Sequence, residues 1–155
     1  MRPEYHVIAS TVASAALYAT TGSLPAAVAC AVSGVAIDGD HVLDYMVEYG
    51  PRFQPRHFFD VWRHGALHRA FLVCHSWELV IILGIAGWFV SAGGILLGLF
   101  VGLGHHLLLD QLAYWPHPLA YTFLWRWRNG FELRRSFRNL PPIEDEPAGM
   151  EEAPK

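Results

Sequence analysis

Histidine and aspartate residues, whose side chains bind metal ions, occur in three groups along this chain of 155 residues. Imidazole and carboxylate ligands together suit Zn²⁺, and also Mn²⁺ or Fe²⁺. A bound ion would lower the pKa of a water molecule and supply a hydroxide nucleophile near neutral pH. We therefore predict a divalent metal centre with one or two ions, zinc in first place. Its candidate ligands are Asp38, Asp40, His41, His64, His68, His75, His106 and Asp110.

The spacing within two of the groups fits one face of a helix. Successive residues of an α-helix are about 100° apart, so His106 and Asp110 would lie about 40° apart. His68 and His75 would lie about 20° apart by the same geometry. His64 precedes His68 by four residues and would lie on the same stripe. Each of these two helices can therefore present its ligands together.

The remaining group is Asp38-Gly39-Asp40-His41. Asp38 and His41 are three residues apart and share one face of a helix. Asp40 lies on a different face if the helix is regular. Gly39 could interrupt that regularity, and both aspartates could then point inward.

The positions of the basic residues predict how the groups come together. All eleven Lys and Arg residues lie in three parts of the chain, separated by two long apolar blocks without a basic residue. Basic residues concentrate in the cytoplasmic segments of membrane proteins. The pattern predicts a multi-pass protein of the inner (plasma) membrane with both termini and the central loop in the cytoplasm. This topology places all three groups, and also His6, at one membrane depth.

Composition favours a membrane protein as well. The chain is 53% hydrophobic and only 16% charged, whereas about a quarter of the residues of soluble domains are charged. Residues 79–103 include no charged side chain. The alternative is a soluble helical bundle with a buried hairpin, in which the basic residues would not need to segregate. No basic patch with regularly placed aromatic residues indicates nucleic-acid binding, and the pattern does not predict an oligomeric state.

The expected fold is all-α: a four-transmembrane-helix bundle with a short C-terminal interfacial helix. One membrane-embedded helical domain covers residues 1–140, and residues 141–155 form a disordered acidic tail. Helices are expected at residues 6–20, 25–49, 64–90 and 95–114, and the interfacial helix at 119–131. An inner loop is expected at 50–63 and an outer turn at 91–94.

Three charged residues near the predicted ligands are candidates for other roles. Arg69 is the only basic residue within the groups, and it either extends to the headgroup region or binds phosphate oxygens. Asp44 or Glu78 could act as a general base if neither binds metal. Ionisable groups inside membrane segments normally face the protein interior or a wet cavity.

The three groups resemble the motifs of a bacterial and archaeal family of small membrane-bound, metal-dependent hydrolases, known chiefly as a domain of unknown function. The matching motifs are Asp38-Gly39-Asp40-His41, then His68-Arg69 with His75-Ser76, and then His106 to Asp110. The resemblance covers roughly residues 6 to 118 and implies hydrolysis. The family usually has four residues between the two histidines of the middle motif, whereas six intervene here. Which of His64, His68 and His75 takes each role therefore stays open.

These observations lead to one functional hypothesis and two alternatives. The hypothesis is an integral membrane metal-dependent hydrolase acting on a phosphoester of a lipid headgroup at the cytoplasmic membrane surface. Membrane lipid is then the expected partner, and a lipid phosphate the expected substrate. The first alternative is a non-catalytic metal-binding or metal-transporting membrane protein. The second is a helper subunit of a membrane complex that docks through its acidic tail.

Overall fold

The computed structural model describes residues 3–90, 94–114, 116–137 and 140, and within these it is all-helical, as expected, with no strand. The only strand-like feature there is a single bridge between Arg69 and Glu132. The acidic tail and the outer turn at 91–93 lie outside the described residues. The helices are α1 Pro3–Thr21, α2 Leu24–Ala36, α3 Gly39–Tyr49, α4 Pro55–His64, α5 Trp77–Phe89, α6 Ile95–Tyr114, α7 Phe123–Arg128 and α8 Leu133–Ser136.

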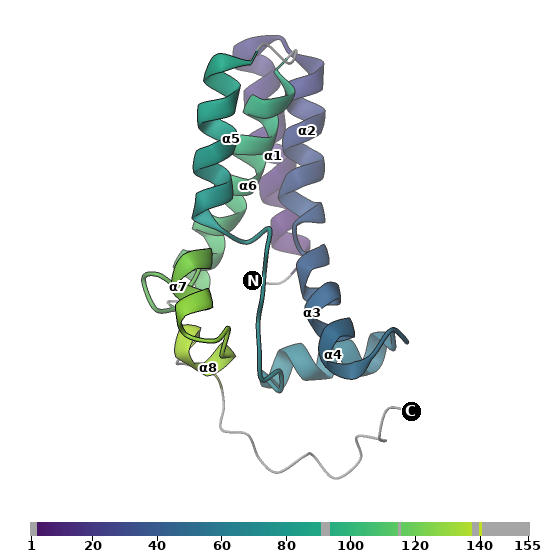
Figure 1. Ribbon diagram of the computed structural model, residues 1–155. Coiled ribbons are helices and arrows are strands. Elements are labelled where there is room, and N and C mark those ends of the chain that lie inside the picture. Colours follow the sequence, from purple (N-terminus) through teal and green to yellow (C-terminus); the bar gives the residue numbers. More distant parts are fainter. Residues whose placement is uncertain (1–2, 91–93, 115, 138–139, 141–155) are drawn as a thin grey trace.

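Four helices, α1, α2, α5 and α6, lie side by side (Figure 1). Helix α6 contacts the other three, and α1 also contacts α2. Large apolar side chains face outward on these helices, among them Trp88, which is 85% exposed. An outward apolar surface of this kind suits contact with lipid.

Two helical stretches in the described part of the chain are long and apolar enough to cross a membrane, Leu24–Tyr49 and Ile95–Tyr114. The sequence predicted four. Helix α5 is apolar but has only 13 residues, fewer than the roughly 20 that span a bilayer. Helix α1 has 19 residues but is rich in Ala, Ser and Thr. The expectation of four spans is therefore met for two segments.

Small residues allow α6 to pack closely on α2. A Cβ atom added to Gly98 would contact the carbonyl oxygen of Ala26, and one added to Gly102 would lie 2.6 Å from the carbonyl oxygen of Cys30. Neither contact could be relieved without separating the helices. This close approach sets the position of His106, one turn after Gly102.

The predicted helix at residues 64–90 is wrong in its first half. Helix α4 ends at His64, and the next residue, Gly65, has a left-handed φ of 60°. Helix α5 begins only at Trp77. Ser76 caps its start by accepting a hydrogen bond from the amide of Leu79. Residues 65–76, called the His75 segment below, are irregular in between. The stripe of His64, His68 and His75 on one helix therefore does not exist.

Helix α4 occupies the region predicted to be an inner loop. Pro55 stands at its start, where a proline is well tolerated. Its apolar side is buried in a core formed by Tyr45, Val61, Leu67, Ala70, Leu72 and Leu133. Burial of this side explains why the segment is helical despite its two arginines, Arg56 and Arg63.

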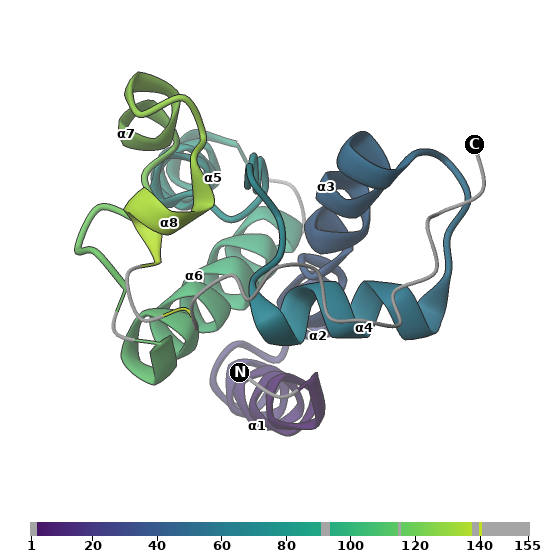
Figure 2. The ribbon, with the colours of Figure 1, turned by 90° about the horizontal axis from the view of Figure 1, so that it is seen from below.

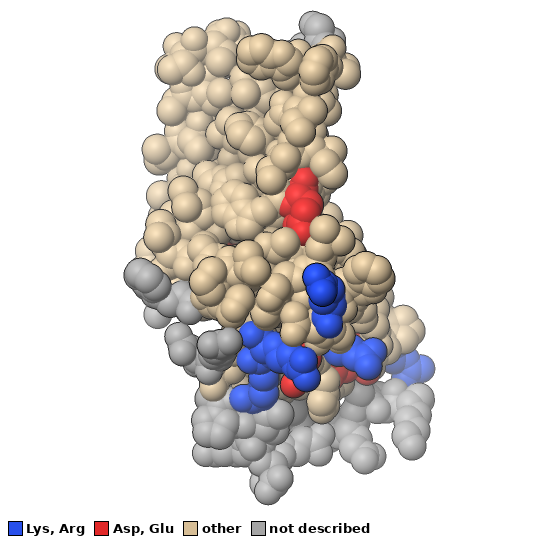
Figure 3. All heavy atoms as spheres, turned by 60° about the vertical axis from the view of Figure 1, so that its left-hand side comes forward, with Lys and Arg blue, Asp and Glu red and all other residues tan. Residues whose placement is uncertain are grey.

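The charged end of the molecule carries α3, α4, α7 and α8. Seen from below, α4 runs across this end beside α3, while α7 and α8 lie beneath α5 (Figure 2). On the face shown in Figure 3, most of the charged side chains gather here, and the far end of the long helices has none. Within the range 119–131, where a single helix was expected, α7 covers only Phe123–Arg128, and α8 follows beyond it. Backbone hydrogen bonds from Ala70 to Phe131 and from Leu133 to His68 attach this region to the His75 segment.

Candidate metal centre

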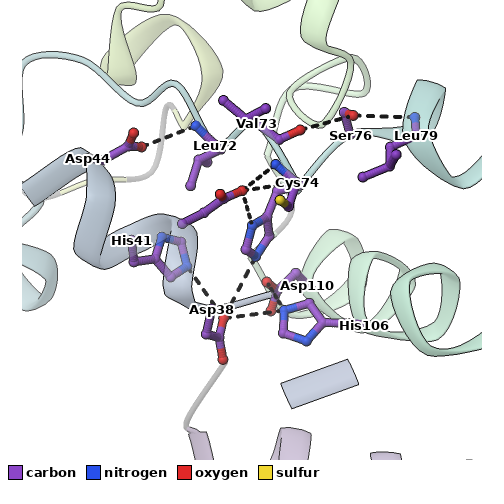
Figure 4. Close-up of polar contacts among 12 residues, drawn as sticks. Asp38, His41, Asp44, Leu72, Val73, Cys74, Ser76, Leu79, His106 and Asp110 are labelled. Atoms are coloured by element: carbon purple, nitrogen blue, oxygen red, sulfur yellow. Dashed lines mark hydrogen bonds and ion pairs between the residues drawn. The ribbon is translucent and has the colours of Figure 1, made fainter. Parts of the chain in front are cut away.

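Three imidazole rings surround one carboxylate oxygen at the junction of α2 and α3 (Figure 4). Helix α2 ends at Ala36 and α3 begins at Gly39, so Asp38 lies in the interruption between them. The Oδ1 atom of Asp38 is 3.6 Å from Nε2 of His41, 3.7 Å from Nε2 of His75 and 3.4 Å from Nε2 of His106. Asp38, His41 and His75 form a group able to hold a metal ion.

The second ring nitrogen of His75 and of His106 is already engaged. Nδ1 of His106 donates to the carbonyl oxygen of Gly34 at 2.8 Å. Nδ1 of His75 lies 3.3 Å from Oδ2 of Asp40. A proton on Nδ1 leaves the Nε2 lone pair of a neutral imidazole free. Metal-binding histidines in proteins are oriented in this way.

The Nε2 atoms of His75 and His106 are buried, yet neither makes a hydrogen bond within the described part of the chain. Both rings are completely inaccessible to solvent. A buried polar atom without a partner costs about 1–3 kcal/mol. A cation between these nitrogens and Asp38 would remove that cost at both positions.

A second group of possible ligands adjoins the first. Nε2 of His6 lies 3.1 Å from Oδ1 of Asp110, and Nε2 of His106 lies 3.4 Å from Oδ2 of the same carboxylate. The rings of His6 and His106 are stacked with centroids 3.9 Å apart. His6, His106 and Asp110 are all buried and could also hold a metal ion. Because His106 is close to both carboxylates, the two groups are continuous.

Asp40 and Asp44 hold the His75 segment rather than facing Asp38. Oδ2 of Asp40 accepts hydrogen bonds from the amides of Cys74 and His75, and Oδ2 of Asp44 accepts one from Leu72 at 3.2 Å. The two carboxylates are one turn apart on α3, so the segment runs along that helix. Burial, together with the charge of Asp40, raises the pKa of the Cys74 thiol.

The other sequence-predicted residues lie away from the cluster. His64 is exposed, and its ring is bonded to the carbonyl of Asp60. His68 is 81% exposed and pairs with Glu48. Arg69 is exposed as well. His64 belongs to α4, a helix separate from α5, and His68 and Arg69 lie in the irregular segment, where helical spacing no longer decides which way a side chain points.

Glu78 has a structural role that the sequence did not suggest. Its two carboxylate oxygens accept hydrogen bonds from the amides of Phe123 and Leu124, at the start of α7. Carboxylates are stabilised at the positive end of a helix. Glu78 therefore anchors α7 to the beginning of α5 and does not enter the cluster.

Sequence reasoning gave two residues no site role, His6 and Arg126. His6 was expected at the same membrane depth as the predicted ligands but was not proposed as a ligand. Arg126 was expected in an interfacial helix, yet it is completely buried. Burial lowers the pKa of its guanidinium, an effect that Glu78 and Tyr121 oppose. The pattern of aromatic and basic residues around Arg126 gives no signal that separates it from its exposed neighbour Arg128.

A polar hollow of about 290 Å³ lies between α3 and the His75 segment. It is lined by Asp44, Val47, Glu48, His68, Arg69 and Phe71. The lining includes none of the cluster residues Asp38, His41, His75 and His106.

Comparison with known proteins does not place the chain in a family. No protein-family model, curated protein or solved structure matches it. The function must therefore be argued from the site.

Proposed function

We propose that this protein is an integral membrane hydrolase that depends on a divalent metal. The observation that carries the proposal is the arrangement of His75 and His106. Two buried Nε2 atoms without hydrogen bonds face one oxygen of Asp38, at 3.7 and 3.4 Å, while their Nδ1 atoms are held in place. Such pre-oriented nitrogens beside a carboxylate suit a metal ion better than a purely structural cluster.

The residues divide into ligands and supports. Asp38, His41 and His75 would hold one ion, and His6, His106 and Asp110 a second. Asp40 orients His75, and Gly34 orients His106 through its carbonyl oxygen. Imidazole with carboxylate suits zinc first, and manganese or iron as alternatives. When bound, the metal would supply an activated water molecule near neutral pH.

The proposal includes all four long helices in the membrane. Two of them satisfy the length and composition of a span, and α1 and α5 run alongside α6. The end with α4, α7 and α8 carries most of the basic residues, which supports placing it in the cytoplasm. The cluster lies where the long helices meet that end, near the depth of the lipid headgroups.

A site at this depth favours a phosphoester of a lipid headgroup as substrate. Arg69 and His68 line the polar hollow with Asp44, and an arginine can bind phosphate oxygens in pairs. Asp44 is the candidate general base because it lines the hollow. Glu78 does not line it and is engaged at α7. The order of the three motifs, which resembles that of membrane-bound hydrolases, also supports hydrolysis.

Hydroxyl groups nearer the end of the long helices away from the cluster favour hydrolysis over transport. Ser14 donates to the carbonyl oxygen of Ala27 at 2.6 Å. Thr20 donates to the carbonyl of Ala16 in its own helix. These hydroxyls satisfy the backbone and do not line a path for an ion.

The experiment combines metal analysis with an activity screen. Protein purified without chelator is analysed for metal, and phosphate release is measured from a panel of phospholipids and prenyl phosphates in nanodiscs. We expect bound metal and phosphate release in the wild type, both lost in Asp38→Ala and both kept in His64→Ala, because His64 is exposed and lines neither the cluster nor the hollow. Absence of metal from the wild type would contradict the proposal. Metal without activity on any lipid would favour a metal-binding protein.

A further inference from the structure

The His75 segment holds a strained conformation. Leu72 has a φ of 46°, in the left-handed region that residues other than glycine seldom adopt. Such a conformation persists only where the surrounding structure enforces it. Leu72 and His75 are three residues apart, so whatever enforces the backbone at Leu72 also fixes the position of the His75 ring.

Carboxylates of α3 hold the amide groups of this segment. Asp44 accepts from the amide of Leu72, and Asp40 accepts from those of Cys74 and His75. These contacts engage only the amides, so the buried carbonyl groups of Leu72 and His75 need hydrogen-bond donors from elsewhere in the protein.

Arg126 supplies that second set of contacts. Nη2 of its guanidinium donates to the carbonyl oxygen of Leu72 at 2.8 Å, and Nη1 donates to those of His75 at 3.0 Å and Ala120 at 2.7 Å. The side chain is 0% exposed, and it is the one arginine buried in the described part of the chain. One planar group thus bonds to the backbone at both Leu72 and His75.

We propose that Arg126 is a positioning residue for the metal centre, holding the backbone at Leu72 and His75 so that the His75 ring faces Asp38. The inference rests on the metal-binding part of the proposed function. Arg126 has no contact with the cluster oxygens or imidazole nitrogens and acts through the backbone. A buried guanidinium is costly unless its donors are satisfied. Here three carbonyl oxygens accept from Nη1 and Nη2, whereas Nε makes no hydrogen bond within the described part of the chain. Lysine cannot reproduce this geometry, because its ammonium is a point charge on a flexible chain.

The test uses Co²⁺ as the probe and the full-length protein in detergent. Arg126→Met removes the donors, Arg126→Lys keeps the charge, and Arg128→Met is the matched control at an exposed arginine of the same helix. A fourth variant, Val80→Ala, removes packing from the core of α5 and α6 and controls for general loss of stability. Helicity, thermal unfolding, Co²⁺ affinity and the visible spectrum of bound Co²⁺ are measured for each.

We expect Arg126→Met to bind Co²⁺ about 10–100-fold more weakly, the range found when groups supporting a ligand are removed. Its cobalt spectrum should change because the His75 ligand moves. Arg126→Lys should have a Co²⁺ affinity between those of Arg126→Met and the wild type. Arg128→Met and Val80→Ala should keep the wild-type spectrum. An unchanged affinity and spectrum in Arg126→Met would overturn the inference. An equal loss in Val80→Ala would show that Arg126 is only structural.

A nitroxide label on Cys74 separates this inference from the proposed function. Cys74 is exposed and Cys30 is buried, so the label attaches within the His75 segment. Without any metal, we expect the label to be more mobile in Arg126→Met than in the wild type. If the wild type binds no Co²⁺, the proposed metal-dependent function fails. The mobility of the Cys74 label still tests whether Arg126 holds the His75 segment. If Arg126→Met does not fold, Arg126→Lys takes its place in both measurements, and a wild-type spectrum and mobility there would contradict the inference.

Discussion

Nε2 of His106 lies 3.4 Å from Oδ1 of Asp38, although the two residues belong to different helical stretches far apart in the chain. They meet because α6 packs closely on α2 and because α2 stops just before Asp38. At the interruption the amides of Asp38, Asp40 and His41 bond to carbonyl groups three residues back rather than four, while Asp38 itself keeps a helical φ of −62° and ψ of −11°. This one contact joins the two groups of possible metal ligands.

The histidines of the middle motif should differ sharply in their effect on metal content. His75→Ala should lose most of the bound metal, because the buried Nε2 beside Asp38 disappears. His68→Ala should keep it, since His68 is exposed and pairs with Glu48. Elemental analysis of both purified variants checks this, with size-exclusion profiles as a control for folding. Full metal occupancy in His75→Ala would exclude His75 as a ligand.

The close contact of α6 with α2 should not tolerate a side chain at Gly102. Gly102→Val places carbon atoms against Cys30 and Ser33, and overpacking of this kind costs about 1–3 kcal/mol. The helices should separate, His106 should move from Asp38, and metal should be lost. Thermal unfolding and metal analysis measure both effects. The control is Gly104→Ala, whose new methyl group meets only Val80, at 3.6 Å; equal effects of the two changes would contradict the argument.

Asp40 should support metal binding without being a ligand. Asp40→Asn keeps an oxygen but removes the charge that holds two amides and the His75 ring. We expect about 10–100-fold weaker metal binding, with protein of normal helicity. Competition with a chelating dye gives the affinity. Glu48→Gln, which alters the carboxylate bound to His68 outside the cluster, should bind as tightly as the wild type; a similar loss there would point to a general charge effect.

His6 should control a second ion. The wild type should bind two ions, one at each group of ligands, and His6→Ala should bind one, because it leaves Asp38, His41 and His75 intact. Titration with Co²⁺, read as equivalents bound per chain, checks the number. A single equivalent in both proteins would show that the two groups share one ion.

The outward face of α5 should contact lipid. Ile85 is 56% exposed, and an aspartate in the middle of a spanning helix costs about 2.5–3.5 kcal/mol. Ile85→Asp should therefore reduce the amount of protein that stays in the membrane fraction after an alkaline wash, whereas Ile85→Val should not. A stable Ile85→Asp variant that is soluble without detergent would instead support a soluble helical protein.

Local periodicity was enough to predict part of this protein. The apolar blocks predicted an all-helical chain, and four-residue spacing predicted that His106 and Asp110 share a face, because helix geometry acts over one turn. A break at Gly39 was considered possible, and the structure interrupts the helix just before it, at Ile37 and Asp38.

Contacts between distant residues decided the rest. His75, rather than His64 or His68, joins Asp38 because Asp40, Asp44 and Arg126 draw the segment away from helical geometry. Spacing along the chain contains no information about such partners. The burial of Arg126 and the approach of His6 to Asp110 also depend on which surfaces pack together, and only the assembled helices determine that.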